Sequence, residues 1–358
     1  NVTKWAVEMK AKSSSFGGWP REIAVADTKA DALAQFKEKY EGLQTGAKSK
    51  GAASFVIYRK RGEAGAFIGK KIGREYIDLH KAEDVKAART YLADNTDKLE
   101  KVLERYKDTP YERGEENAPR VGGDHRNGAP VTPEVFGQTF GFRGVQFGNY
   151  VEQVRRQSDL NEAFDALMDM AAVLGIPPKA ISLNGRLGLA FGARGKGGKN
   201  APAAHYETGN MVINLTKGGG PGSLAHEWFH AMDNYFAKQG GDAGYMTDGA
   251  TGSALREEMR QAFKSVKTAI NAGALKLRSL ELDKRRTKPY WSTPAEMAAR
   301  SFESYVIAKL QDQNASNDYL ANVVDQKVWD ISEAARSEFF TGQKAEPSYP
   351  YPTVDELP

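Results

Sequence analysis

Two histidines four residues apart carry the strongest chemical signal in this chain of 358 residues. His226-Glu227-Trp228-Phe229-His230 fits the pattern His-Glu-x-x-His. On a helix, residues i and i+4 lie on one face, so both imidazoles can bind one tetrahedral metal ion while Glu227 lies beside the metal-bound water. The chain has five histidines and no cysteine, so a transition-metal site must use histidines and carboxylates. The pattern predicts a Zn²⁺ site with Glu227 as general base; the alternative is a chance match on a buried helix.

The third metal ligand is expected to be a carboxylate on a later helix. Glu296 and Glu303 are seven residues apart, two helical turns, so one can bind metal while the other supports a neighbouring ligand. Glu296 is the preferred ligand and Glu303 the alternative. A structural role for Glu296 stays open, because Thr293-x-x-Glu296 with Pro294 at the first helical position is also a capping box.

Several other side chains are candidates for supporting roles. Asp233 follows His226 by seven residues, where a carboxylate can accept the second imidazole N–H; the alternative is a solvated helix residue. Further candidates are donors to an oxyanion, each more often structural when taken alone, and substrate-binding groups. The oxyanion candidates are His205, Tyr206 and Tyr305, and the substrate-binding candidates are Asn214 and Arg194.

The loop 194–200 alternates glycine with basic residues just ahead of a predicted strand at 211–215. That strand is expected to be the sheet edge on which an extended peptide substrate pairs. Arg194, Lys196 and Lys199 can hold acidic substrate groups if the loop closes as a lid. An ordinary solvated connection is the alternative.

Hydrophobic periodicity and turn residues predict an α+β protein with two domains. Residues 1–108 are expected to form a small α+β adaptor domain, and residues 109–133, rich in Pro, Gly and charge, a linker. Residues 134–346 are expected to form a zincin-like metallopeptidase domain, followed by a Pro-rich extended tail at 347–358. Removing residues 1–115 should then leave metal binding intact.

Composition sets limits on partners. Charged residues make up 27% of the chain and hydrophobic residues 40%, and no apolar run approaches the roughly 20 residues that cross a bilayer, so no membrane partner is expected. The net charge of +4 names no partner by itself and gives only weak support to a nucleic-acid partner. The basic clusters 59–61 and 284–286 are typical of solvated faces, with contact to phosphate as the less favoured alternative. The chain starts at Asn1 without a leader, which predicts a piece of a longer polypeptide with further modules.

Three stretches resemble the large polyvalent protein-associated domains found in multidomain proteins of phages and conjugative elements: residues 141–149, 187–195 and 223–236. The resemblance runs from about Gly69 to Tyr351. It implies a zincin-like metallopeptidase module, often fused to methylase, helicase or nuclease-like modules. The Glu296-to-Glu303 stretch also looks like the third-ligand helix of gluzincins, although Ala295 stands where Asn is usual.

Together, these features predict a zinc metallopeptidase, a hydrolase that acts on a protein or peptide substrate. The resemblance implies action in the cytoplasm of a bacterial host, after delivery with phage or conjugative DNA, against host factors or on its own polyprotein. A non-catalytic zinc-containing binding or packaging module associated with phage or plasmid DNA is the alternative.

Overall fold

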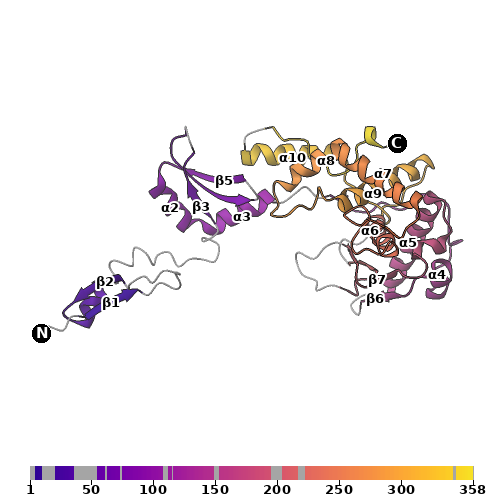
Figure 1. Cartoon of the computed structure of the whole chain (residues 1–358), viewed down its shortest axis with the longest axis horizontal. Coiled ribbons are helices and arrows are strands. Elements are labelled where there is room, and N and C mark those ends of the chain that lie inside the picture. The colour runs from indigo at the N-terminus through magenta and orange to yellow at the C-terminus, as the bar shows by residue number, and fades with distance from the viewer. Residues whose placement is uncertain are drawn as a thin grey trace. The chain divides into compact units, whose positions relative to one another are not determined.

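The computed structural model describes residues 5–9, 21–35, 55–60, 63–72, 75–107, 112–114, 116–148, 153–194, 204–216, 222–341 and 344–357. The chain divides into two compact units, residues 1–105 and 106–358 (Figure 1). Both combine helices with strands, which confirms the predicted α+β class. Among the described residues, no helix is both long enough and apolar enough to cross a membrane.

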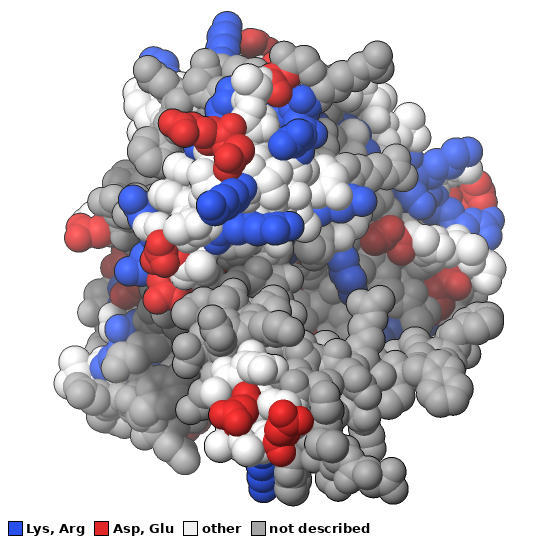
Figure 2. All heavy atoms as spheres, turned by 90° about the vertical axis from the view of Figure 1, so that its left-hand side faces the viewer, with Lys and Arg blue, Asp and Glu red and all other residues white. Residues whose placement is uncertain are grey.

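The two units differ in charge. Residues 1–105 contain 21 Lys and Arg against 15 Asp and Glu, a net charge of +6, whereas residues 106–358 contain 29 against 31, a net charge of −2. The basic excess of the chain therefore belongs to the first unit. On the side of the molecule that Figure 2 shows, basic and acidic side chains are interspersed, so the sign of the surface is mixed there.

Strands of the first unit form two separate sheets. β1 and β2 make an antiparallel pair, and β3, β4 and β5 make an antiparallel sheet in that order. The central strand β4 was not predicted, because Gly69 and two lysines interrupt its apolar pattern. The strand bounds are Trp5–Met9 (β1), Arg21–Ala26 (β2), Val56–Tyr58 (β3), Ala66–Ile72 (β4) and Glu75–Ala82 (β5).

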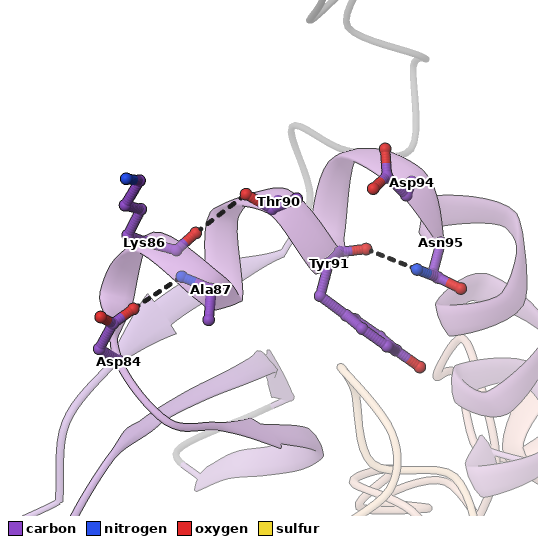
Figure 3. Close-up of a pocket in the computed structure, with 7 residues that line it drawn as sticks. All are labelled: Asp84, Lys86, Ala87, Thr90, Tyr91, Asp94 and Asn95. Carbon is purple, nitrogen blue, oxygen red and sulfur yellow. Dashed lines mark hydrogen bonds between the residues drawn. The ribbon is translucent and has the colours of Figure 1, made fainter.

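Helix α2 (Val85–Asp94) packs against all three strands of the larger sheet, and α3 (Thr96–Lys107) follows it; residues 29–35 are also helical. Asp84 begins α2 as its N-cap, accepting the backbone N–H of Ala87 at 2.7 Å. A shallow pocket along α2 is lined by residues between Asp84 and Asn95 (Figure 3). Beneath α2, the His80 ring stacks on Tyr91 with centroids 3.5 Å apart.

The second unit is built on a four-stranded sheet in the order β6-β7-β9-β8. β6, β7 and β9 are parallel, and β8 pairs antiparallel with β9 at the edge. The predicted strand at 211–215 is therefore present but internal, and the edge strand is β8, which carries His205 and Tyr206. The strand bounds are Val145–Phe147 (β6), Gly188–Phe191 (β7), Ala204–Glu207 (β8) and Val212–Leu215 (β9).

Helices enclose this sheet. Helix α6 contacts β8, β9 and α9, and the largest apolar cluster joins α5 and α6 to the inner faces of β7 and β9. The last helices surround a second apolar group at Trp291 and Trp329. The helix bounds are Pro133–Phe140 (α4), Gln153–Leu174 (α5), Leu224–Gln239 (α6), Glu257–Ala272 (α7), Ala274–Asp283 (α8), Pro294–Asp312 (α9) and Gln326–Thr341 (α10), with short 3-10 turns at Pro178–Ser182 (η2) and Val354–Glu356 (η3).

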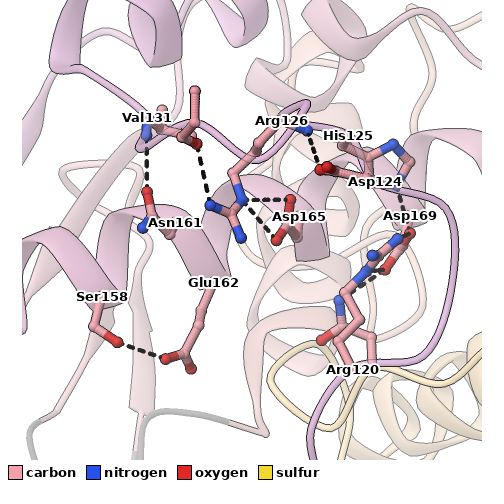
Figure 4. A network of polar contacts seen from close by, with 12 residues as sticks. Arg120, Asp124, His125, Arg126, Val131, Ser158, Asn161, Glu162, Asp165 and Asp169 are labelled. Atoms are coloured by element: carbon pink, nitrogen blue, oxygen red, sulfur yellow. Dashed lines mark hydrogen bonds and ion pairs between the residues drawn. The ribbon is translucent and has the colours of Figure 1, made fainter.

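The predicted linker is instead part of the second unit (Figure 4). Arg120 donates two hydrogen bonds, of 2.6 and 2.7 Å, to Asp169 on α5, and Arg126 donates to Asp165 on the same helix at 2.9 Å. Val121 pairs with Ser316 in a β-bridge. Charge pairing with α5 compensates for the small apolar content of this segment, a long-range effect that local composition does not show.

The C-terminal tail, predicted to be extended throughout, is irregular up to Thr353 and then forms the 3-10 turn η3, and it lies against the core. Tyr349 and Tyr351 are buried. Arg278 donates to the carbonyl oxygens of both tyrosines at 2.8 and 2.9 Å, and Arg300 on α9 donates to Pro350 O at 2.9 Å. The tail thus packs as part of the second unit.

Candidate metal centre

Helix α6 carries the His-Glu-x-x-His residues and is buried on nearly all sides, with 12 of its 16 residues inaccessible. Leu224 and Ala225 face the main core, while Phe229 on another side packs with residues of α9. The Trp228 indole N–H donates to Ile181 O at 2.9 Å. These contacts fix the rotation of α6 about its axis, and therefore the direction of both imidazoles.

His226, His230 and Glu296 come together between α6 and α9, with one ligand atom from each lying within 4.8 Å of the others. The two Nε2 atoms are 3.1 Å apart, and each lies 3.4 Å from an oxygen of Glu296. Ligand atoms about 2.0–2.1 Å from a tetrahedral zinc ion would be separated by about 3.3 Å. The donor set and its spacing therefore fit Zn²⁺.

The structure separates the two roles left open for Glu296. Thr293 is the N-cap residue of α9 with Pro294 at the first helical position, but Thr293 makes no side-chain cap hydrogen bond. Its hydroxyl donates to Tyr290 O at 2.9 Å instead. Glu296 points toward the histidines rather than back to the start of its helix, so the capping box does not form.

Glu303 lies behind the histidine pair. Its Oε2 is 3.0 Å from His226 Nδ1, so this carboxylate can accept the imidazole N–H on the side away from Nε2. Glu303 is fully buried and also forms an ion pair with Arg113, whose guanidinium donates to Gly222 O at 2.8 Å. Arg113 was not predicted as a site residue, because a single Arg in a Pro/Gly-rich stretch gives no local signal.

Buried charges shift the pKa values of the cluster. Burial lowers the pKa of His226, but the charge of Glu303 and the contacts with Glu296 outweigh burial and raise that pKa to about 10. Burial raises the pKa of Glu296, yet the two histidines hold it well below its usual range. The pKa of Glu227 is raised, chiefly by burial. The carboxylates thus favour a positive charge at His226, while Glu227 has the raised pKa that suits a proton acceptor.

Tyr245 and Tyr290 also lie at this cluster, and neither was predicted. The Tyr245 ring centroid is 5.4 Å from that of His230. Burial, together with the charges of Glu296 and Glu227, raises the pKa of Tyr245 to about 12, so its hydroxyl keeps its proton at neutral pH. Burial and Glu296 also raise the pKa of Tyr290. Both tyrosines stand in irregular segments, where sequence spacing does not indicate proximity.

The predicted contact between Asp233 and an imidazole is wrong. Asp233 is fully buried, which also excludes the solvated alternative, and its carboxylate accepts the hydroxyl and the backbone N–H of Thr247. Although Asp233 follows His226 by two turns, the residue that supports His226 is Glu303 of the neighbouring helix. Asp233 instead anchors the loop that carries Tyr245.

The other predicted donors lie on separate elements. On β8, the Tyr206 hydroxyl donates to Asn234 of α6 at 2.9 Å, and His205 Nε2 is 3.6 Å from Glu207. Tyr305 is half-buried and packs against the apolar core, with its ring stacked on Phe302. The structure therefore groups none of these three with the metal-ligand residues, although Tyr206 links the edge strand to α6.

The predicted substrate-binding pair, Asn214 and Arg194, is engaged within the fold. The fully buried Asn214 amide bonds both the backbone N–H and the carbonyl of Arg194 at 3.2 Å. The Arg194 guanidinium donates to Glu207 at 2.9 Å. Asn214 thus anchors the start of the predicted lid, whose residues 195–200 lie outside the described part of the chain.

Comparison with protein families matches residues 1–139 to large polyvalent protein-associated domain 5 and residues 282–357 to large polyvalent protein-associated domain 1. The two ends of the chain thus match two different large polyvalent protein-associated domains. The domain 5 segment supplies Arg113, and the domain 1 segment supplies Glu296 and Glu303. His226 and His230 lie between the two matches. No curated protein and no solved structure matches the chain.

Proposed function

We propose that this polyvalent-protein segment is a zinc-dependent metallopeptidase with a zincin-like second unit. The observation that carries the proposal is the meeting of His226, His230 and Glu296 at ligand spacing beside the acidic Glu227. Glu296 Oε2 is buried and has no hydrogen-bond partner in the described part of the chain. The charged groups next to this oxygen are His226 Nε2 at 3.4 Å and Arg300 Nη1 at 3.8 Å, and a cation bound at ligand distance would complete its partners.

The chain's own residues have distinct roles in peptide hydrolysis. A zinc ion bound here would acidify a water molecule and polarise the scissile carbonyl. Glu227 takes the water proton and transfers it to the leaving amine. The Tyr245 hydroxyl donates a hydrogen bond to the developing oxyanion. Glu303, held by Arg113, fixes the tautomer and orientation of His226.

The substrate we propose is an extended peptide that pairs with β8. An exposed strand edge presents free backbone N–H and C=O groups to which a peptide can add as a further strand. β8 is the edge strand and contacts α6, which carries the histidines, so a peptide on this edge runs beside the ligand cluster. The substrate is then a host protein or the chain's own polyprotein, in the cytoplasm of a host that received phage or conjugative DNA.

Metal analysis with two substitutions tests the proposal. Protein purified without chelator and supplied with zinc should hold about one equivalent per chain. Glu296→Gln should lose most of this zinc, because a neutral amide is a weak ligand. Glu227→Gln should keep its zinc and lose at least about 10²-fold in kcat on a peptide library, because the proton acceptor is gone.

Glu258→Gln on the exposed side of α7 is the matched control and should change neither property. If the unaltered protein held less than about a tenth of an equivalent of zinc, the proposed metal site would be excluded. Full zinc content with equal cleavage by the unaltered protein and Glu227→Gln would assign the cleavage to a contaminant and remove the proposed mechanism.

A further inference from the structure

In the described part of the chain, one face of the β3-β4-β5 sheet of the first unit is not covered by a helix. Ile68 and His80 share a register position and face α2, where His80 stacks on Tyr91. At the adjacent position Tyr58, Phe67 and Lys81 are aligned across the three strands, so they lie on the opposite face. We call this opposite face of β3-β4-β5 the aromatic face.

Three rings lie next to one another on the aromatic face. The Tyr58 centroid is 6.0 Å from that of Phe67 and 5.1 Å from that of Tyr76. Gly69 makes this possible, because a Cβ at that position would lie 2.9 Å from the Tyr58 hydroxyl and 2.1 Å from Ile77 O. Tyr76 is 51% exposed, although it is a large ring on a strand, so part of this surface is open to a flat ligand.

Lysines border the rings. Lys60 and Lys81 lie over the Phe67 ring, 4.8 and 5.2 Å from its centroid, and Lys71 lies 5.8 Å from the centroid of Tyr76. Asp78 and Glu63 are the acidic neighbours: Asp78 pairs with Lys60 and accepts from Tyr58, and Glu63 is 3.9 Å from both Lys60 and Lys81.

We propose that the aromatic face binds single-stranded nucleic acid. Bases stack on Tyr76 and Tyr58, and Lys71 and Lys81 contact the phosphates. This function is separate from peptide hydrolysis and uses no residue of the second unit.

Two features favour this ligand. Aromatic rings on an open sheet next to lysines combine the stacking and charge contacts that single strands use, whereas the stacked bases of a duplex present no free ring face. The first unit carries the net charge of +6, while the second carries −2, so a polyanion is attracted to this unit.

Fluorescence anisotropy of a labelled dT₁₂ oligonucleotide with the full chain tests the proposal. Tyr76→Ala should weaken binding about 5- to 50-fold, because stacking of one base is lost. Lys71→Gln/Lys81→Gln should weaken binding and lower the slope of log K against log salt by about 1.4, because each phosphate contact on a single strand contributes about 0.7. A 12-base-pair duplex should bind more weakly than dT₁₂.

Lys86→Gln/Lys101→Gln removes the same charge from exposed positions on helices α2 and α3 and should bind dT₁₂ as the unaltered chain does. A melting temperature measured for each variant checks that the fold is kept. The proposal is overturned if dT₁₂ does not bind, if the duplex binds as tightly as dT₁₂, or if Tyr76→Ala binds as well as the unaltered chain. It is also overturned if both lysine pairs lower affinity equally.

Discussion

Two buried polar clusters in the second unit contain similar residue types but differ in how their polar atoms are satisfied. In the first, Asp169 accepts hydrogen bonds from Arg120 and His125 at 2.6–2.7 Å (Figure 4). It also accepts one from Asn317 at 2.7 Å. In the second, two imidazole Nε2 atoms and the Glu296 carboxylate face one another. There, Glu296 Oε2, His230 Nδ1 and Arg300 Nη1 have no hydrogen-bond partner among the described residues, although Arg300 Nη1 and Glu296 Oε2 form a longer ion pair at 3.8 Å.

This difference separates a structural cluster from a binding site. Buried polar groups in native proteins are almost always paired, so a complete set of partners around Asp169 indicates that its work is to hold the segment 116–132 on α5. Unpaired donors and acceptors around His226 and His230 would be costly unless a ligand compensates for them. Substitutions around Asp169 should therefore lower stability equally with and without zinc, whereas substitutions around His226 and His230 should change zinc binding or catalysis.

The largest expected effect is on stability, in the cluster without metal ligands. Asp169→Asn leaves the Arg120 guanidinium without its carboxylate and should lower the free energy of unfolding by about 3 kcal/mol, near the lower end for a broken buried pair because Arg120 keeps some solvent contact. Urea unfolding followed by circular dichroism, with and without zinc, measures this loss, which should be the same in both conditions.

The pH dependence of this loss has a fixed sign. Burial raises the pKa of Asp169, but Arg120, Asn317 and His125 outweigh burial and lower it. A lowered pKa contributes stability above the unfolded value of about 3.9, and this stability is lost as pH falls through the folded pKa. The difference between the unaltered chain and Asp169→Asn should therefore shrink in acid. A loss that appears only without zinc would contradict the assignment of this cluster as structural.

A smaller effect, on catalysis alone, is expected at Tyr245. Tyr245→Phe keeps the ring beside His230 and removes the hydroxyl, so kcat should fall about 10²-fold, or about 2.7 kcal/mol, with little change in KM. Steady-state kinetics on a cleaved peptide measure this, and zinc content should stay the same. Tyr305→Phe, packed against the apolar core, is the control; equal losses in both variants would deny Tyr245 a role in the transition state.

The smallest effect is expected at Arg113, which acts on the metal through Glu303 and His226. Arg113→Gln should weaken zinc binding about 10- to 100-fold, because residues that orient ligands typically contribute that much. Competition with a chromogenic chelator measures the affinity, with Arg260→Gln on α7 as control. Unchanged zinc affinity in Arg113→Gln would show that Glu303 holds His226 without it.

Two truncations test whether Arg113 supports zinc binding through Glu303 and His226. Removing residues 1–105 keeps Arg113 and should leave zinc affinity unchanged, whereas removing residues 1–115 deletes Arg113 and should lower it. Equal zinc affinity in the two truncated proteins would favour the sequence-based expectation that residues 1–115 take no part in metal binding.

Local sequence patterns were sufficient to predict the structure wherever the residues concerned lie on one helix or strand. The i, i+4 spacing placed His226 and His230 on one face of α6. The predicted strand at 211–215 matches β9 within one residue. These features depend on backbone geometry that repeats along the chain, so the sequence alone determines them.

Tertiary structure decided the contacts between elements. Glu296 and Glu303 are two turns apart on one helix, but only the packing of α9 on α6 places one at the Nε2 atoms and the other at Nδ1 of His226. Likewise, a Pro/Gly-rich segment belongs to the folded unit because Arg120 meets Asp169 across 49 residues of sequence. Such pairing depends on which surfaces of distant segments pack together, and the short-range spacing of residues does not indicate it.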